Sequence, residues 1–275
     1  MHPVLLRRRE HRGFGLPRAL SKMRIGATLA LAAALSLGLA SVVHAQGRGG
    51  APGASPPAAK QSAPVDLTGY WVAVVTEDWH YRMVTPARGD YAGIPINPAS
   101  KKAADLWDPA TTPARDEAAG EQCKSYGAPA LMRVPERLHI TWQDDNTLKV
   151  ETDAGEQIRL FHFGDRSARA GAPTWQGDSV ARWESGDMKV VTANLRPGYL
   201  RKNGVPYSDK TTLTEYWDLS VEHYLAEPHK DEQWLVITSI VDDPVYLQSP
   251  WLTGLHFKRE ADGSKWDPQP CSAKW

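Results

Sequence analysis

The sequence predicts an all-β, mainly antiparallel domain, either a β-barrel or a strongly curved meander sheet, with one or two short helices in a long insertion. Three observations lead to this prediction. Residues 137–195 contain short runs in which apolar and polar residues alternate, as in Leu138-His139-Ile140-Thr141-Trp142. Turn signals rich in Asp, Asn, Ser and Gly separate these runs. The runs recur at about ten-residue spacing with no helical pattern between them, which is typical of antiparallel strands that curl into a barrel or sandwich.

The first 45 residues have the pattern of an N-terminal extension followed by a secretory signal peptide. A basic lead precedes the apolar run Leu29–Leu39, and small residues before and at Ala45 predict cleavage after Ala45. Translation from Met1 or from Met23 is consistent with such a signal. The alternative is a retained membrane anchor, because Ile25–Val43 is barely long enough to span a bilayer. The cleavage pattern favours a periplasmic or secreted protein with no stable membrane insertion after the signal is removed.

Removal of the signal changes the charge of the chain. The whole sequence has 32 Lys and Arg and 32 Asp and Glu, of which seven basic and one acidic residue lie in residues 1–45. The remaining 25 basic and 31 acidic residues give a net charge of −6. A mildly acidic surface argues against nucleic acid as a partner.

A tether and a single domain follow the signal. Residues 46–64 are rich in Gly, Pro, Ala and Ser and have no large apolar side chain, so we expect a disordered linker. Residues 65–275 then form one barrel-like domain. Leu67–Val75 is its predicted first strand, and Trp79–Val84 is predicted as a second strand or as a continuation of the first.

About forty irregular residues come next, and two short helices are predicted within them. Asn97 is a candidate N-cap, with Pro98 at the favoured first helical position. Asp108-Pro109 should end this helix, whose apolar face would hold Ala99, Ala103, Leu106 and Trp107. A second helix is predicted over Pro113–Ala119, with Gly120 as its stop. A long irregular loop in a compact domain is often a lid or a binding loop.

The remaining strands complete the predicted sheet. Hairpin signals define strands within residues 137–143, 148–151, 157–163, 180–184 and 188–194. Three longer apolar-alternating runs are Thr211–Leu219, Gln233–Val241 and Leu252–Lys258. In all, nine or ten strands are expected.

Gly69-Tyr70-Trp71 in the first strand resembles the Gly-x-Trp motif of lipocalins. That resemblance implies a lipocalin-like barrel in which Trp71 closes one end and packs against a basic residue near the last strand. Lys258 and Arg259 are the two candidates. The forty-residue insertion departs from the lipocalin pattern.

A broader resemblance covers about residues 123–258. Its motifs are Thr174-Trp175-x-Gly177-Asp178-Ser179, Trp183-Glu184-x-Gly186-Asp187, Gly204-x-Pro206-x-Ser208 and the pair Asp243-Pro244 followed by Tyr246 and Pro250-Trp251. These motifs are similar to those of a large family of exported proteins of Gram-negative bacteria. The resemblance implies export and a β-rich fold, and it transfers no catalytic residues.

The sequence has eleven Trp and only four Phe. Each Trp combines a large apolar ring with one donor N–H. One interpretation is a cavity that binds a small apolar or aromatic molecule; the alternative is ordinary barrel core. Under the first interpretation the candidate ligand-binding residues are Trp79, Tyr81, Arg82, Trp142, Arg159, Trp183 and Trp217.

A second hypothesis is a periplasmic acid–base enzyme, such as an isomerase, dehydratase or hydrolase-like protein. Glu215 shares a strand face with Leu213 and Trp217, so it is a candidate buried carboxylate, with Arg82 or Arg159 as its partner. Glu215, Arg82 and His162 are the candidate catalytic residues; a purely structural ion pair is the competing interpretation. No nucleophile motif, metal-ligand spacing or cofactor motif is present in the sequence, so neither a metal nor a cofactor is predicted.

Two further features have structural interpretations. Asp242-Asp243-Pro244 lacks the spaced ligands of a calcium loop and predicts a Pro-fixed turn with local Asp hydrogen bonds. Cys123 and Cys271 are the only cysteines, and in an exported chain they predict one disulfide. That bond should pin the C-terminal tail across the insertion, beside one end of the barrel, with Trp266 or Trp275 packed there.

Overall fold

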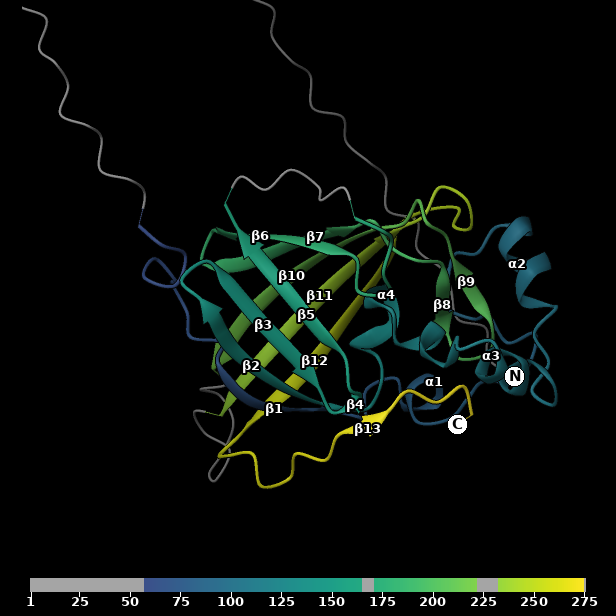
Figure 1. The fold of residues 1–275 in the computed structure, drawn as a ribbon, viewed down its shortest axis with the longest axis horizontal. Helices are drawn as coiled ribbons and strands as arrows, with labels where there is room; N and C mark the ends of the chain where they lie inside the picture. Colours follow the sequence, from purple (N-terminus) through teal and green to yellow (C-terminus); the bar gives the residue numbers. More distant parts are fainter. Residues whose placement is uncertain (1–56, 165–170, 222–231, 275) are drawn as a thin grey trace, which may run out of the picture. The chain divides into compact units, whose positions relative to one another are not determined.

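The computed structural model describes residues 57–164, 171–221 and 232–274. Within these residues, nine strands form a closed barrel in the order β1-β12-β11-β10-β7-β6-β5-β3-β2, and β2 pairs back with β1 (Figure 1). The predicted all-β barrel is therefore confirmed. Its strands are β1 (Gly69–Ala73), β2 (Arg137–Asp144), β3 (Thr147–Thr152), β5 (Ile158–Phe163), β6 (Asp178–Glu184), β7 (Asp187–Ala193), β10 (Thr212–Val221), β11 (Gln233–Asp242) and β12 (Trp251–Glu260).

The barrel is mainly antiparallel, as expected, but it is a mixed sheet. β2 and β3, β6 and β7, and the run β10 to β12 are antiparallel neighbours. Ser185 and Gly186, with φ of 58° and 103°, supply the left-handed pair that a tight two-residue hairpin between β6 and β7 requires. β5 and β6 are parallel, which the alternation pattern could not reveal because it is the same for both strand directions.

Alternate side chains of the barrel strands point inward and form the core. The core cluster includes Leu138, Ile140, Leu148, Val150, Phe161, Ala181, Met188, Val190, Trp217, Leu235, Ile237, Leu255 and Phe257. Burial of each large apolar side chain contributes about 1.5–3 kcal/mol. A one-residue slip would turn the whole set outward, so this pattern fixes the strand register.

Trp71 of β1 makes the contact expected from the Gly-x-Trp motif. Its ring is fully buried, and the guanidinium of Arg259 lies 4.5 Å from the ring centroid. Arg259 also donates to the carbonyl oxygens of Thr68 and Asp66, at 3.1 and 3.0 Å. Of the two basic candidates, Arg259 and not Lys258 closes this end of β1.

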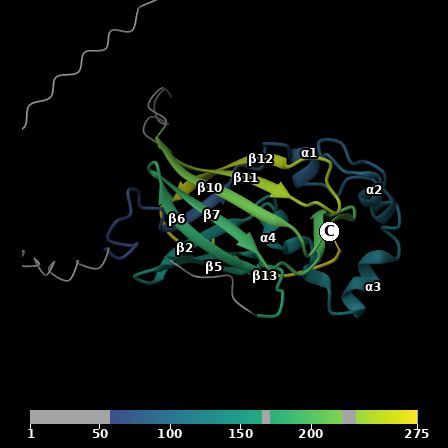
Figure 2. The same ribbon diagram turned by 90° about the horizontal axis from the view of Figure 1, so that it is seen from above.

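The insertion between β1 and β2 contains more helix than predicted. It holds α1 (Trp79–Arg82), α2 (Pro98–Ala104), α3 (Thr112–Ala118), the 3-10 helix η1 (Gln122–Tyr126) and α4 (Ala128–Leu131). Figure 2 shows α1, α2 and α3 gathered at one end of the barrel, which we call the insertion end. Only α2 and α3 correspond to the two predicted helices.

The predicted strand Trp79–Val84 is wrong, because its first residues form the one-turn helix α1. Asp78, with φ of 52°, turns the chain before the helix. The Arg82 side chain then donates from Nη1 to the carbonyl of Val74 (2.8 Å) and from Nε to the carbonyl of Arg133 (3.1 Å). Six residues of alternation cannot distinguish a short strand from one helical turn, and these tertiary bonds decide the outcome.

The N-terminal cap of α2 is confirmed, and its apolar face is corrected. Asn97 Oδ1 accepts a hydrogen bond from the Ser100 N–H at 2.9 Å. The helix ends at Ala104, earlier than Asp108-Pro109. Its buried residues are Ser100 and Ala104 rather than Ala99 and Ala103. Beyond the helix, Leu106 is 75% exposed, whereas Trp107 is buried as predicted.

A hairpin of β8 (Gly198–Arg201) and β9 (Val205–Tyr207) stands outside the barrel and was not predicted. Asn203 at its turn donates to the carbonyl oxygens of Ala87 and Asp90 in the insertion. Gly204 has φ of 84°, and a Cβ there would lie 2.3 Å from Trp107 Cβ. The hairpin therefore holds the insertion in place through close backbone packing.

The predicted disulfide is confirmed. Cys123 in η1 is bonded to Cys271, with a Cα–Cα distance of 5.1 Å. The tail is also held by Lys274, which pairs with Glu117 of α3 at 3.0 Å. The Pro-rich tail also pairs in a two-stranded sheet, since β13 (Gln269–Pro270) lies parallel to β4 (Ala154–Gly155).

The predicted packing of the tail tryptophans is confirmed only in part. Trp266 meets Tyr70 and His139 edge-on, with ring centroids 6.0 Å apart in both cases. Tyr70 and His139 belong to β1 and β2, so Trp266 packs against barrel strands and not against the insertion. Trp275 lies outside the described residues.

Residues 57–64, expected within the disordered linker, have a defined position instead. The Ala59 N–H donates to Asn146 Oδ1 at 2.9 Å, and the Lys60 N–H donates to the Asp145 carbonyl at 3.0 Å. The Ala59 carbonyl accepts from Trp183 Nε1 at 2.9 Å. Disorder was predicted because the segment has no large apolar side chain to bury. Three hydrogen bonds of its backbone hold it against the barrel instead.

The predicted signal peptide, residues 1–45, and residues 46–56 of the linker lie outside the described residues. Across the ranges 57–164, 171–221 and 232–274, no helix has the length and apolar character needed to cross a membrane.

Candidate functional site

The middle of the barrel is filled by packed side chains. Trp217, a predicted ligand-binding residue, is fully buried and meets Phe161 edge-on with ring centroids 5.2 Å apart. Close packing of this kind is what a protein core shows. Trp217 is therefore a core residue, and ligand sites have to be sought at the ends of the barrel.

One ion pair crosses this core. Arg159 of β5 donates from Nη1 and Nη2 to the two carboxylate oxygens of Glu215 in β10, at 3.0 and 2.5 Å, and both side chains are fully buried. Nη2 also donates to Thr192 Oγ1 at 3.3 Å, and Thr192 bonds with Ser179 at 2.8 Å. The prediction that Glu215 is a buried carboxylate paired with Arg159 is confirmed. A bidentate pair with further hydrogen bonds is the arrangement in which buried charges are tolerated.

Glu136 is a second buried carboxyl, and sequence reasoning missed it. It precedes β2, its side chain is buried, and neither carboxyl oxygen has a hydrogen-bond partner among the described residues. Burial raises the pKa of Glu136 well above its ordinary value, and the nearby Asp153 adds to the rise, whereas Arg82 and Arg159 oppose it.

The three candidate catalytic residues do not converge. Glu215 is engaged by Arg159 inside the barrel. Arg82 is buried at the insertion end, where it binds backbone carbonyls. His162 neighbours inward-facing Phe161 and Phe163 on β5, so it projects from the opposite face of the strand, and it contacts Thr147 at 3.3 Å. The geometry gives no support to an acid–base site made of these three groups.

Two of the predicted ligand-binding tryptophans line the end of the barrel opposite the insertion. Trp142 and Trp183 flank Phe163, with ring centroids 5.6 and 5.1 Å from it. Ala59 packs into the same cluster and accepts the indole hydrogen bond of Trp183. Residues 57–62 therefore pack against this end, and with Phe163 and Trp183 they line a hollow of about 480 Å³.

The other two predicted aromatics lie on α1 at the insertion end. Trp79 is 57% exposed and contacts His80 edge-on. Tyr81 is half-buried beneath the guanidinium of Arg201, which lies 4.1 Å from its ring centroid. Tyr81 lines a hollow.

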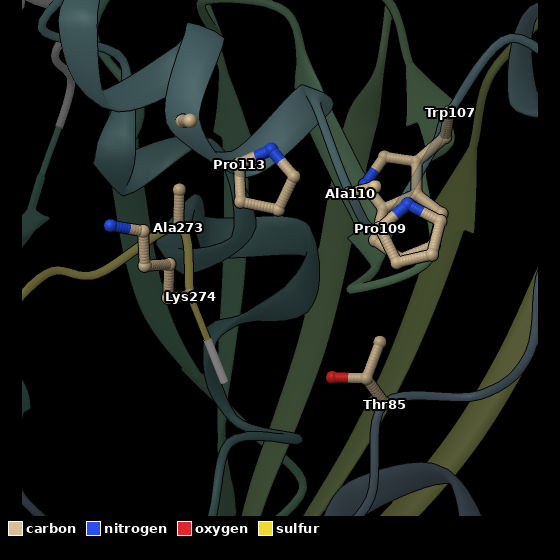
Figure 3. Close-up of a pocket in the computed structure, with 8 residues that line it drawn as sticks. Thr85, Trp107, Pro109, Ala110, Pro113, Ala273 and Lys274 are labelled. Atoms are coloured by element: carbon tan, nitrogen blue, oxygen red, sulfur yellow. The ribbon is translucent and has the colours of Figure 1, made fainter.

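A hollow of about 300 Å³ lies between the insertion and the C-terminal tail, and we call it the tail pocket. Figure 3 shows its side chains arranged around an open space, with Trp107, Pro109 and Ala110 facing Ala273 and Lys274. The lining is mostly apolar: Trp107, Pro109, Ala110, Pro113, Ala114 and Ala273, with Thr85 and Lys274 as the polar members. Thr85 Oγ1 is buried and has no hydrogen-bond partner among the described residues. The disulfide holds the tail wall in place.

A second hollow of about 240 Å³ lies where α1, the hairpin β8–β9 and β12 meet, and we call it the arginine pocket. Arg133 and Arg201 line it together with Tyr81, Trp251 and Asp78. The Arg133 guanidinium lies 5.2 Å from the Trp251 ring centroid, and Arg133 forms an ion pair with Asp78. Burial, and secondarily the charge of Arg133, lowers the pKa of Arg201.

Comparison with family models, curated proteins and solved structures gives no match. The likeness to lipocalins and to exported β-rich proteins therefore remains an expectation from the sequence motifs.

No sequence pattern predicted either pocket as a whole. The tail pocket joins residues from positions 85, 107–114 and 273–274, and the arginine pocket joins residues from five separate segments. The only local hints were the long irregular insertion and the second cysteine in the tail. Chemically, both hollows are suited to holding a small molecule by packing and charge.

Proposed function

We propose that the protein is an exported binding module, periplasmic or secreted, that holds a small apolar or aromatic molecule in the tail pocket. The observation that carries this proposal is the lining of that pocket. It is mostly apolar and ring-sized, with Trp107 and two prolines as flat surfaces, and within the described part of the chain the Thr85 hydroxyl has no hydrogen-bond partner. Ligand sites typically combine a mostly apolar wall with few polar groups.

The walls of the pocket are rigid, which favours binding. Pro109 and Pro113 have fixed φ angles, and Trp107 is held against Gly204 of the β8–β9 hairpin. The tail wall is fixed twice, by the disulfide and by the ion pair of Lys274 with Glu117. A preformed site loses little conformational entropy when it binds its ligand.

Two features support the exported setting. A disulfide is typical of proteins that leave the reducing cytosol. The basic, apolar and small-residue pattern of residues 1–45 is that of a secretory signal. The closed barrel then serves as the scaffold, as it does in lipocalin-like proteins, although the proposed ligand lies outside its packed interior.

The test is a titration of the mature protein with a neutral fluorescent apolar probe, N-phenyl-1-naphthylamine. We expect saturable fluorescence enhancement that unlabelled neutral aromatics displace. Ala114→Leu, which fills part of the hollow from α3, should lower probe affinity by about tenfold or more, because the added side chain occupies space that the probe needs. Ala118→Leu is the matched control, since Ala118 is an exposed position of the same helix that does not line the pocket. It should leave affinity unchanged.

Two results would contradict the proposal. The first is the absence of saturable probe binding to the folded wild-type protein. The second is equal weakening by Ala114→Leu and Ala118→Leu, which would mean that the probe binds to a surface other than the tail pocket.

A further inference from the structure

We propose that the arginine pocket is a second ligand site, distinct from the tail pocket, and that it binds the carboxylate of a small organic anion. The anion would be held by Arg201 and Arg133 at the insertion end of the barrel. This inference does not depend on the proposed function of the tail pocket.

Arg201 offers an unused pair of donors. Its side chain is more than nine-tenths buried, and only Nη1 is engaged, by the Ala92 carbonyl at 2.9 Å. Nε is buried without a hydrogen-bond partner, and Nη2 has none among the described residues. Nε and Nη2 form the edge of a guanidinium that matches the two oxygens of a carboxylate.

A buried cation of this kind costs free energy unless an anion compensates it. In the described residues no carboxylate lies within ion-pair distance of Arg201, although Asp78 and Asp90 act on it from farther away. The structure instead places a second cation, Arg133, beside the same hollow. Two arginines against the single lining carboxylate of Asp78 leave the hollow with an excess positive charge.

The frame of the pocket sets the size and character of the anion. Tyr81 and Trp251 hold the two guanidinium groups by cation–π contacts, at 4.1 and 5.2 Å, so the donors are oriented before a ligand arrives. Thr253 adds a hydroxyl to the wall, and Leu252 adds an apolar surface. A volume of about 240 Å³ is large enough for a carboxylate with one ring or a short alkyl chain.

Asp78 is the internal competitor for this site. It pairs with Arg133, and it neutralises part of the charge that an incoming carboxylate would meet. Its φ of 52° is left-handed, and Asn tolerates this conformation almost as well as Asp does. Asp78→Asn therefore removes the competing charge while preserving the backbone.

The experiment is calorimetric titration of the mature protein with benzoate and hexanoate, with benzamide as the neutral match and sulfate as an inorganic anion. Wild-type protein should bind one or both carboxylates and bind benzamide at least about tenfold more weakly. Arg201→Gln should reduce carboxylate affinity by about tenfold or more, as for the loss of a charge-assisted hydrogen bond. Arg182→Gln, at an exposed arginine of β6, is the control for loss of one positive charge and should have little effect.

Asp78→Asn should change benzoate affinity in the direction opposite to Arg201→Gln. This result is decisive, because general damage to the fold cannot tighten binding. We expect it to raise benzoate affinity by about threefold or more. The proposal is overturned if wild-type protein binds neither carboxylate, if Arg201→Gln and Arg182→Gln behave alike, or if sulfate binds as tightly as benzoate. Benzoate binding that Ala114→Leu abolishes and Arg201→Gln leaves intact would assign the anion to the tail pocket and would also overturn it.

Discussion

Asp243 shows how one side chain can organise a turn. It is almost fully buried, and its carboxylate accepts hydrogen bonds from the Ser208 N–H (2.6 Å), the Ser208 hydroxyl (2.9 Å), the Thr211 hydroxyl (2.9 Å) and the Val245 N–H (2.8 Å). The predicted Pro-fixed turn with local Asp hydrogen bonds is therefore confirmed. The carboxylate also joins the end of β11 to the segment before β10, which the local sequence could not reveal.

Replacing Asp243 should destabilise the domain strongly. Asp243→Ala leaves these four donors and the Tyr246 N–H (3.2 Å) without their acceptor, and we expect the free energy of unfolding to fall by about 2–4 kcal/mol. Asp242→Ala is the control, since Asp242 is the exposed neighbour and should change stability by less than about 0.5 kcal/mol. Urea unfolding followed by circular dichroism measures both. Equal effects of the two substitutions would contradict the role given to the buried carboxylate.

At the scale of elements, local sequence patterns predicted the barrel strands correctly. They did not predict segments whose conformation depends on tertiary contacts. The hairpins around β2, β3, β6 and β7 were predictable because alternation and turn residues lie within a few positions of each other. α1 was not, since its conformation depends on the reach of Arg82 to Val74 and Arg133. The two pockets were not predictable for the same reason: their walls come from segments that only the folded chain brings together.

The C-terminal tail is the element that the disulfide should control. The bond joins residues 148 positions apart, and on the chain-entropy model its loss costs about 3–5 kcal/mol at most. Cys271→Ser should free the tail, raise protease sensitivity near residues 109–125 and weaken binding of the neutral probe, because Ala273 and Lys274 form one wall of the tail pocket. Limited proteolysis with mapping of the first cuts is the measurement. First cuts within β2 to β7 would mean that the bond supports the whole barrel instead.

Over the whole molecule, the barrel accommodates its buried ionisable groups in two ways, as an ion pair and as a neutral acid. Arg159 and Glu215 satisfy each other inside the core, and breaking such a pair is costly. Glu136 has no such partner among the residues that the structure describes, and its raised pKa means that the folded protein holds it as a neutral acid over a wider pH range than the unfolded chain does. The stability of the domain is thereby linked to pH.

The sign of this linkage follows from where the proton is bound more tightly. The folded state binds a proton on Glu136 more tightly than the unfolded chain, whose Glu has a pKa of about 4.3. The group's contribution to stability is complete below that value and is lost as pH rises through the folded pKa. Glu136→Gln cannot ionise and removes this loss. Its stability relative to wild type should therefore increase with pH above about 4.3 and level off beyond the folded pKa.

Urea unfolding of both proteins between acid and mildly alkaline pH tests this linkage, and the difference between the two curves isolates Glu136 from other titrating groups, including Asp153. Asp209→Asn, at an exposed turn position, is the control and should run parallel to wild type. A difference between Glu136→Gln and wild type that stays constant with pH would mean that Glu136 ionises equally in the folded and unfolded chain. A stability difference that shrinks as pH rises would mean that the ionised carboxylate of Glu136 is stabilised in the folded protein. Neutral Gln gains over Glu at high pH only if the buried carboxylate lacks such stabilisation.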